Sequence, residues 1–170
     1  MESVVVPMKM TRGSLTKTII GCFLSLALVS TAIAASVHFK RRPVFDDLGQ
    51  TLNVMFSLAG LGNGDVTITV AATGSGDITL ISPGGNAAPG QNKVPISAVA
   101  TTTIPSNKIK NGNVFVSLTT GVPPTPTPAE AGAPNDQWNV VLGDVTFSSA
   151  TITVVQGGVI VLQQTFTFAP

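Results

Sequence analysis

The sequence is short of the side chains on which most catalytic and metal sites depend. Its 170 residues include one Cys, one His, one Trp and no Tyr. The one histidine, His38, lies three residues past the expected cleavage point, where we expect a linker residue and not the base of a Ser-His triad. One His and one Cys are also too few for a Cys/His zinc site within a single chain. Carboxylate-pair hydrolysis stays formally open through Asp65, Asp77, Glu130, Asp136 and Asp144. We predict that the chain is not an enzyme, with no catalytic residue, no cofactor-binding residue, no metal ligand and no cofactor.

Charge is scarce as well. Asp, Glu, Lys and Arg make up 10% of the chain, against about 25% in ordinary domains. The formal net charge is +1, and the one charge cluster is Lys40-Arg41-Arg42. A near-neutral chain lacks the basic stripe that is typical of nucleic-acid binding. We predict no nucleic-acid partner.

The first 34 residues have the three parts of a secretory signal. Lys9, Arg12 and Lys17 precede the apolar run 19–29, and Ala32-Ile33-Ala34 forms a small-residue cleavage site. We predict cleavage between Ala34 and Ala35, and therefore a secreted, periplasmic or cell-surface protein. Removal of the signal also removes Cys22, so the mature chain would form no disulfide.

Two other interpretations of this leader stay open. In the first, residues 19–39 reach the ~20 residues that a spanning helix needs, and Lys40-Arg41-Arg42 stops transfer, so an uncleaved segment anchors the protein in a membrane. In the second, Ile19-Ile20-Gly21-Cys22 resembles a bacterial lipobox, with Cys22 lipidated. Only through such a retained segment do we expect contact with a membrane.

After the leader, apolar and polar residues alternate in short runs separated by Gly, Pro and Asn. Leu52, Val54, Phe56 and Leu58 share one face of a predicted strand, and Val66, Ile68, Val70 and Ala72 share one face of the next, joined to it as a meander. Gly74-Ser75-Gly76 predicts a further turn, and 121–134 is a Pro-rich linker that cannot join a ladder. About eight such strands predict an all-β fold, an antiparallel β-sandwich that is Ig-like or jelly-roll-like. The expected domains are the signal peptide 1–34, a linker 35–49 that contains His38, and the sandwich 50–170.

The last 21 residues predict a hairpin around Gly157 and Gly158. A three-residue loop, 156–158, would pair Val154 with Ile160 and Ile152 with Leu162, and would place Gly158 at positive φ. The inner face of this hairpin would then hold Ala150, Ile152, Val154, Ile160, Leu162, Phe166 and Phe168, with Gln164 among them. The outer face would expose an apolar strip of Val155, Val159 and Val161.

The hairpin run is also out of phase with the strand before it. Val145 and Phe147 share a face, whereas Ala150 and Ile152 lie one residue out of step with them. We predict a β-bulge at Ser148-Ser149, where one extra residue returns the apolar side chains to the core.

A Gly-x-Gly-Asp segment occurs twice, at 62–65 and 74–77, and Gly143-Asp144 is a shorter echo. Such turns resemble those of calcium-binding β-roll repeats, and Asp65 and Asp77 are then the residues to mutate. The alternative is that Gly and Asp shape turns, because a calcium site needs about six or more oxygen ligands. We predict turn chemistry here. Trp138 lies in phase with Val140, which predicts a core residue.

The loop 83–92 is the best candidate for recognition, because it is long and rich in amide side chains. Gly84-Gly85-Asn86 followed by Pro89-Gly90-Gln91-Asn92, together with the Thr- and Val-rich C-terminal hairpin, resembles small secreted bacterial proteins of uncharacterised families. The resemblance spans Ile78 to Phe168. It implies a secreted β-sandwich and no particular activity.

We therefore expect a non-catalytic structural or interaction module with a protein or glycan partner. One alternative is a polymerising surface subunit of the pilus or coat type, a homo-oligomer in which edge strands pair between chains. Another alternative is a calcium-dependent carbohydrate-binding domain.

Overall fold

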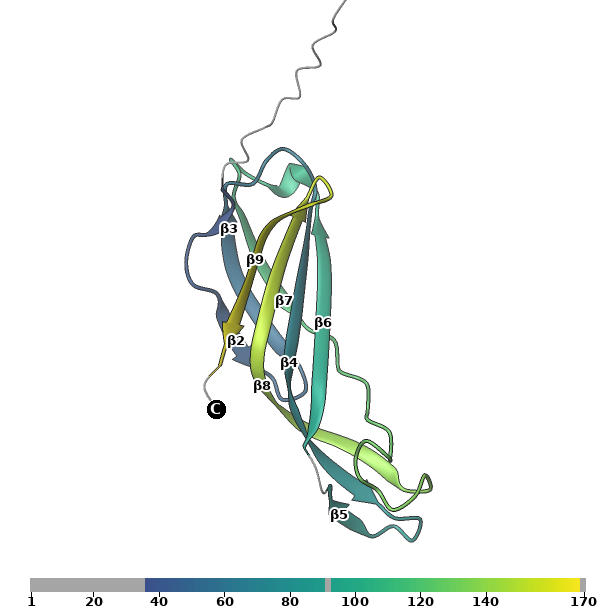
Figure 1. The fold of residues 1–170 in the computed structure, drawn as a ribbon. Coiled ribbons are helices and arrows are strands. Elements are labelled where there is room, and N and C mark those ends of the chain that lie inside the picture. Colours follow the sequence, from purple (N-terminus) through teal and green to yellow (C-terminus); the bar gives the residue numbers. More distant parts are fainter. Residues whose placement is uncertain (1–35, 91–92, 169–170) are drawn as a thin grey trace, which may run out of the picture. The chain divides into compact units, whose positions relative to one another are not determined.

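The computed structural model describes residues 36–90 and 93–168. The predicted signal peptide, its cleavage point and Cys22 lie outside these residues, as do Gln91 and Asn92. The described part is all-β, as predicted, with nine strands in two antiparallel sheets (Figure 1). Within that part, no helix has the length and apolar character that crossing a membrane requires.

Four strands form the first sheet, which we call the β3 sheet: β1 (His38–Phe39), β2 (Val44–Asp47), β3 (Leu52–Ala59) and β7 (Val114–Thr119). Five strands form the second, the β4 sheet: β4 (Val66–Ile81), β5 (Ala87–Pro89), β6 (Val94–Ile104), β8 (Asn139–Gln156) and β9 (Val159–Thr167). A 3₁₀ turn, η1 (Ser106–Lys108), lies between β6 and β7.

The strand order is Ig-like. In the β3 sheet, β2, β3 and β7 lie side by side, and in the β4 sheet the order is β6-β4-β8-β9. In immunoglobulin lettering this is A-B-E facing C′-C-F-G, with β8 and β9 as the F–G hairpin. Of the two architectures predicted, the Ig-like one therefore describes the chain.

The predicted alternation is confirmed, because each apolar set faces the space between the sheets. Leu52, Val54, Phe56 and Leu58 are at most 4% exposed, and Val66, Ile68, Val70 and Ala72 are fully buried. Burying one such side chain contributes about 1.5–3 kcal/mol. This shared apolar interior is what holds the sheets together.

The predicted linker 35–49 contains two of the strands, which corrects the domain boundary. β1 and β2 both pair with β3, and His38 lies opposite Ala59 in β1. The physical reason is aromatic packing: the ring of Phe39 lies 5.5 Å from that of Phe56, and the ring of Phe45 lies 5.2 Å from that of Phe166. Two rings separated by six residues are a weak sequence signal, and charged residues stand between them.

The predicted turn at Gly74-Ser75-Gly76 and the predicted meander are both wrong. β4 runs without interruption through these glycines, and β3 and β4 belong to different sheets. A Cβ on Gly74 would clash with the Thr146 carbonyl oxygen, and one on Gly76 would clash with a Leu142 methyl. Glycine serves here for close strand approach, which is its other role in sheets.

The predicted bulge is confirmed. Thr73 pairs with Ser149 and Gly74 with Phe147, so Ser148 is the extra residue. A second shift lies between the pairs Gly76–Val145 and Ile78–Leu142. Asp77 therefore stands opposite both Gly143 and Asp144. Leu142 and Val145 are both buried although they are three residues apart, so the alternation of buried and exposed residues is interrupted at this point.

The hairpin register differs from the prediction. The loop has two residues, Gly157 and Gly158, both at positive φ (60° and 78°), as a type I′ turn requires. Val155 pairs with Ile160, and a bulge at Val161 then brings Leu162 opposite Val154 and Gln164 opposite Ile152. From Leu162 onward, the two-residue turn and the bulge together place the apolar side chains on the inner face, as the longer loop was expected to do; Ile160 is the exception. Ile152 is buried as predicted, whereas Ile160 is 57% exposed.

Candidate functional site

The two Gly-x-Gly-Asp segments do not form one site. Asp65 precedes β4, where its carboxylate accepts a 2.8 Å hydrogen bond from the Ser106 N–H. Asp77 lies twelve residues further along the same strand, roughly 40 Å away at the usual rise per residue. One ion cannot bridge that distance. Across residues 36–90 and 93–168, no three His, Cys, Asp or Glu side chains are grouped so that they could hold a metal ion.

Asp144, in the shorter echo of the motif, instead shapes its own backbone. The Asp144 carboxylate accepts a 3.1 Å hydrogen bond from the Val145 N–H, which also donates to the Gly49 carbonyl. A Cβ on Gly143 would lie 3.2 Å from the Asp77 carbonyl oxygen. The sequence predicts turn chemistry for these segments, but 74–77 and 143–144 lie within β4 and β8, where they face each other at a β-bulge; only Gly62 to Asp65 lie in a loop before a strand.

Glu130 closes a tight turn within the Pro-rich segment. Its carboxylate accepts hydrogen bonds of 2.8 Å from both the N–H and the hydroxyl of Thr127. These bonds, the backbone one first, lower the pKa of the Glu130 carboxyl below its usual 4.5. Asp136 is exposed further along the same segment. The arrangement is a capping contact, with the carboxylate already occupied.

The predicted recognition loop is shorter than its sequence suggests. Ala87–Pro89 forms β5 and pairs with the end of β4, from Thr79 to Ile81. The turn at 82–86 is closed by the Ser82 N–H, which donates to the Asn86 carbonyl. Trp138, just before β8, packs half-buried against the core, as predicted.

One edge of the β4 sheet is covered over part of its length. The segment 121–126 runs beside β6, and the Gly121 N–H donates a 3.1 Å hydrogen bond to the Val99 carbonyl. Pro123 and Pro126 are buried, and Ala131 is fully buried in the core. The sequence identifies this segment as a linker that cannot join a ladder. Its proline content suits it to cover the edge of β6 instead.

The opposite edge of the same sheet is open. β9 pairs with β8 on one side, and no described strand pairs with its other side. Its nine residues include no charged residue and no Pro, the two devices that usually protect an edge. Val159 is 64% exposed and Ile160 57%. The predicted apolar strip of Val155, Val159 and Val161 is corrected in two respects: Val155 is half-buried, and Val161, the bulged residue, packs half-buried against the core.

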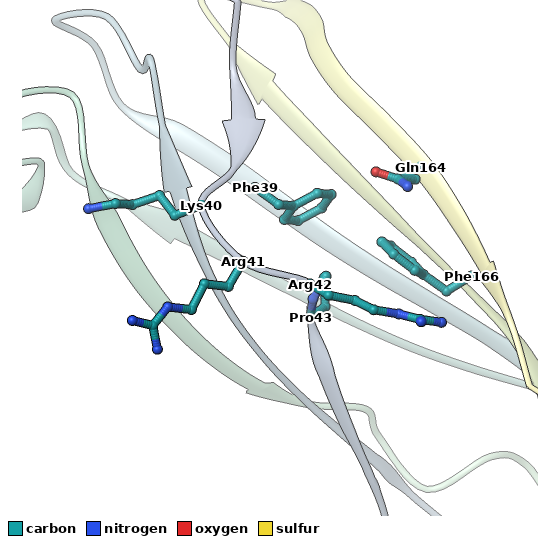
Figure 2. Close-up of a pocket in the computed structure, with 7 residues that line it drawn as sticks. All are labelled: Phe39, Lys40, Arg41, Arg42, Pro43, Gln164 and Phe166. Carbon is teal, nitrogen blue, oxygen red and sulfur yellow. The ribbon is translucent and has the colours of Figure 1, made fainter.

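A cleft of about 450 Å³ opens beside this edge, between β9 and the segment that joins β1 to β2 (Figure 2). Phe39 and Phe166 line it, with their ring centroids 5.7 Å apart. Arg42 extends past Pro43 toward Phe166, whereas Lys40 and Arg41 extend to the other side of the segment (Figure 2). All three cationic side chains are exposed. The sequence shows this site only as a basic cluster between two phenylalanines.

The outer face of the β4 sheet is a ladder of hydroxyl groups. Cross-strand pairs join Thr67 to Thr103 (3.2 Å) and Thr69 to Thr101 (3.0 Å). On the β8–β9 side, Thr151 and Thr165 are 2.8 Å apart. The ladder thus reaches β9, so that the open edge is the border of an uncharged, hydroxyl-rich face.

Comparison with known proteins finds no match, either to a protein-family model or to a curated sequence.

Proposed function

We propose that this chain is a non-catalytic, exported β-sandwich that acts as a structural or interaction module, with the open β9 edge as its contact surface. One observation carries the proposal: a nine-residue edge without charge or proline stays open in a sheet whose other edge is covered along part of β6. A free edge presents a row of backbone N–H and C=O groups to any extended segment that can pair with it. Pairing of this kind is a known mode of peptide recognition.

Export is the second part of the proposal. It is supported by the three-part signal at 1–34, which predicts a secreted, periplasmic or cell-surface location. A mature chain without cysteine depends on packing alone for its stability, and the shared apolar interior of the two sheets suits that need.

The second candidate is a polymerising surface subunit, and the composition of β9 favours it. A strand without charge brings no like-charge repulsion when it pairs with a copy of itself. Such pairing would join two β4 sheets edge to edge and continue the hydroxyl ladder. The two candidate functions share the same contact surface, the β9 edge. They differ only in the partner, which is another copy of the chain in one case and a different protein in the other.

The test uses the full chain expressed in a secreting host. We expect the intact mass of the product to show cleavage after Ala34, and native mass spectrometry over a range of concentrations to give its assembly state. A strict monomer removes the polymerising candidate, whereas concentration-dependent growth that Ile160→Lys abolishes supports it. Unlike these outcomes, calcium-dependent binding to a glycan array that is lost in Asp65→Asn or Asp77→Asn would replace the proposal with the carbohydrate-binding alternative.

A further inference from the structure

We propose that the β9 edge takes an extended segment of a partner polypeptide, and that this segment carries an acidic side chain which binds Arg42. The inference rests on the proposed function and names the partner of the same surface. It joins three observations at one place: the open strand edge, the aromatic cleft beside it, and the cationic rim of that cleft.

The backbone of β9 supplies the first contact. Beyond the bulge at Val161, Leu162 to Thr167 pairs with β8 without a further shift, so the opposite side of that stretch is free for a regular ladder. A partner of about eight residues, roughly 27 Å when extended, would cover it. Main-chain hydrogen bonds of this kind give affinity without fixing the partner's sequence.

The cleft supplies side-chain selection. Phe39 pairs with Leu58 and Val44 with Met55, so the four residues 40–43 stand opposite only Phe56 and Ser57. The β3 sheet therefore opens at its edge, next to Gln164 and Phe166 of β9. In an added strand, alternate side chains would point toward this opening, where Phe39 and Phe166 offer an apolar contact. The other side chains would lie beside Gln163, Thr165 and Thr167 and extend the hydroxyl face.

Charge decides between a foreign strand and a second copy. The residues that line the cleft include three cations and no carboxylate, and Asp46 and Asp47 of β2 are not among them. Arg42 extends along the side of the cleft that β9 borders (Figure 2). A second copy of β9 would bring no acidic side chain to meet it. A guanidinium prefers a carboxylate that it can bind through two hydrogen bonds, so an acidic strand is the better match.

The experiment titrates the processed full-length product with four peptides of about eight residues. In the first, the Glu peptide, every second residue is Thr and the positions between are Val or Glu. The second has Gln in place of Glu, and the third has Lys in place of Glu. The fourth is the Glu peptide with its two central residues replaced by Pro. We expect the Glu peptide to bind most tightly and the Lys and Pro peptides to bind least. The affinity of the chain for the Glu peptide should fall as the salt concentration rises from about 0.05 M to about 0.5 M.

Variants of the basic cluster give the matched controls. Arg42→Glu should weaken the Glu peptide about tenfold, because it removes one attraction and adds one repulsion. Arg41→Glu, with the same charge change one residue away, should weaken it by less than about threefold. Lys110→Glu, exposed and not among the residues that line the cleft, should leave it unchanged.

Each other outcome overturns the inference. Equal affinities for the Glu, Gln and Lys peptides would show that Arg42 does not select the partner. Undiminished binding of the Pro peptide would show that a charged surface, and not a strand edge, is the site. If no peptide binds while the chain self-associates through β9, the inference fails and the proposed function stands as a polymer; if neither occurs, both fail.

Discussion

The two edges of the β4 sheet are treated differently by the same chain. At the β6 edge, a Pro-rich segment lies against the strand and is held by the buried Ala131. At the β9 edge no described segment does so, although β9 is uncharged and its first residues are apolar and exposed. Edge protection is a common need of β proteins. This difference between the two edges supports the proposal that the bare β9 edge is the contact surface.

The first and largest test removes the cover. Ala131→Asp places a carboxylate in a fully buried site, which should lower the free energy of unfolding by at least about 3 kcal/mol and release the segment from β6. Chemical denaturation measures the loss, and light scattering should show association through the newly bared edge. Ala129→Asp, which places the same charge at an exposed position two residues away, is the control. A stable, monomeric Ala131→Asp protein would contradict the role assigned to the cover.

The next test concerns the register that leaves β9 at the edge. Ile152→Ala should cost about 3 kcal/mol of unfolding free energy because the side chain is fully buried, whereas Ile160→Ala should cost less than about 0.5 kcal/mol. Urea denaturation of both variants gives the comparison. Equal losses would favour the three-residue loop, in which Ile160 faces the core.

A smaller effect is expected from the turn that launches β9. Gly158→Ala places a Cβ at φ 78°, which should cost about 1 kcal/mol and speed amide exchange in β9 but not in β6. Gly84→Ala is the matched control, since a Cβ there meets nothing closer than 3.9 Å and its φ is not in the left-handed region. Equal effects of the two substitutions would count against the type I′ turn.

The smallest expected effect is a pH dependence of stability that comes from Glu130, in the Pro-rich segment that lies beside β6. Because the pKa of Glu130 is lowered in the folded chain, its contribution to stability is present above pH 4.5 and is lost as the pH falls through the folded pKa. The melting temperature of the wild type should therefore exceed that of Glu130→Gln at neutral pH, and the two should converge in acid. A gap that widens as the pH falls would show the opposite sign.

Much of the fold follows from local pattern. The period-2 alternation identifies the core faces of β3 and β4, and the phase break after Phe147 locates the bulge at Ser148. Both signals are local, because each strand shows its own buried face in its own sequence. Two of the aromatic pairs that make strands of β1 and β2, Phe39 with Phe166 and Phe45 with Phe166, join residues more than a hundred positions apart, and no local pattern reveals them.

The candidate site, too, depends on contacts between residues far apart in the sequence, which local patterns do not reveal. Glycine has two roles in sheets, and only the partner strand decides between them: Gly74 and Gly76 permit close approach, whereas Gly157 and Gly158 turn the chain. Likewise, Lys40-Arg41-Arg42 appears in the sequence as a junction. Its place beside the β9 edge depends on which sheets face each other, which is a property of the whole fold.

An amide NMR titration of the processed chain with the Glu peptide would show directly whether the β9 edge is the binding surface. Shifts should gather in two places, Leu162 to Thr167 of β9 and residues 39–42, with β6 unaffected. Shifts centred on Val94 to Ile104, or spread evenly over both edges, would contradict it.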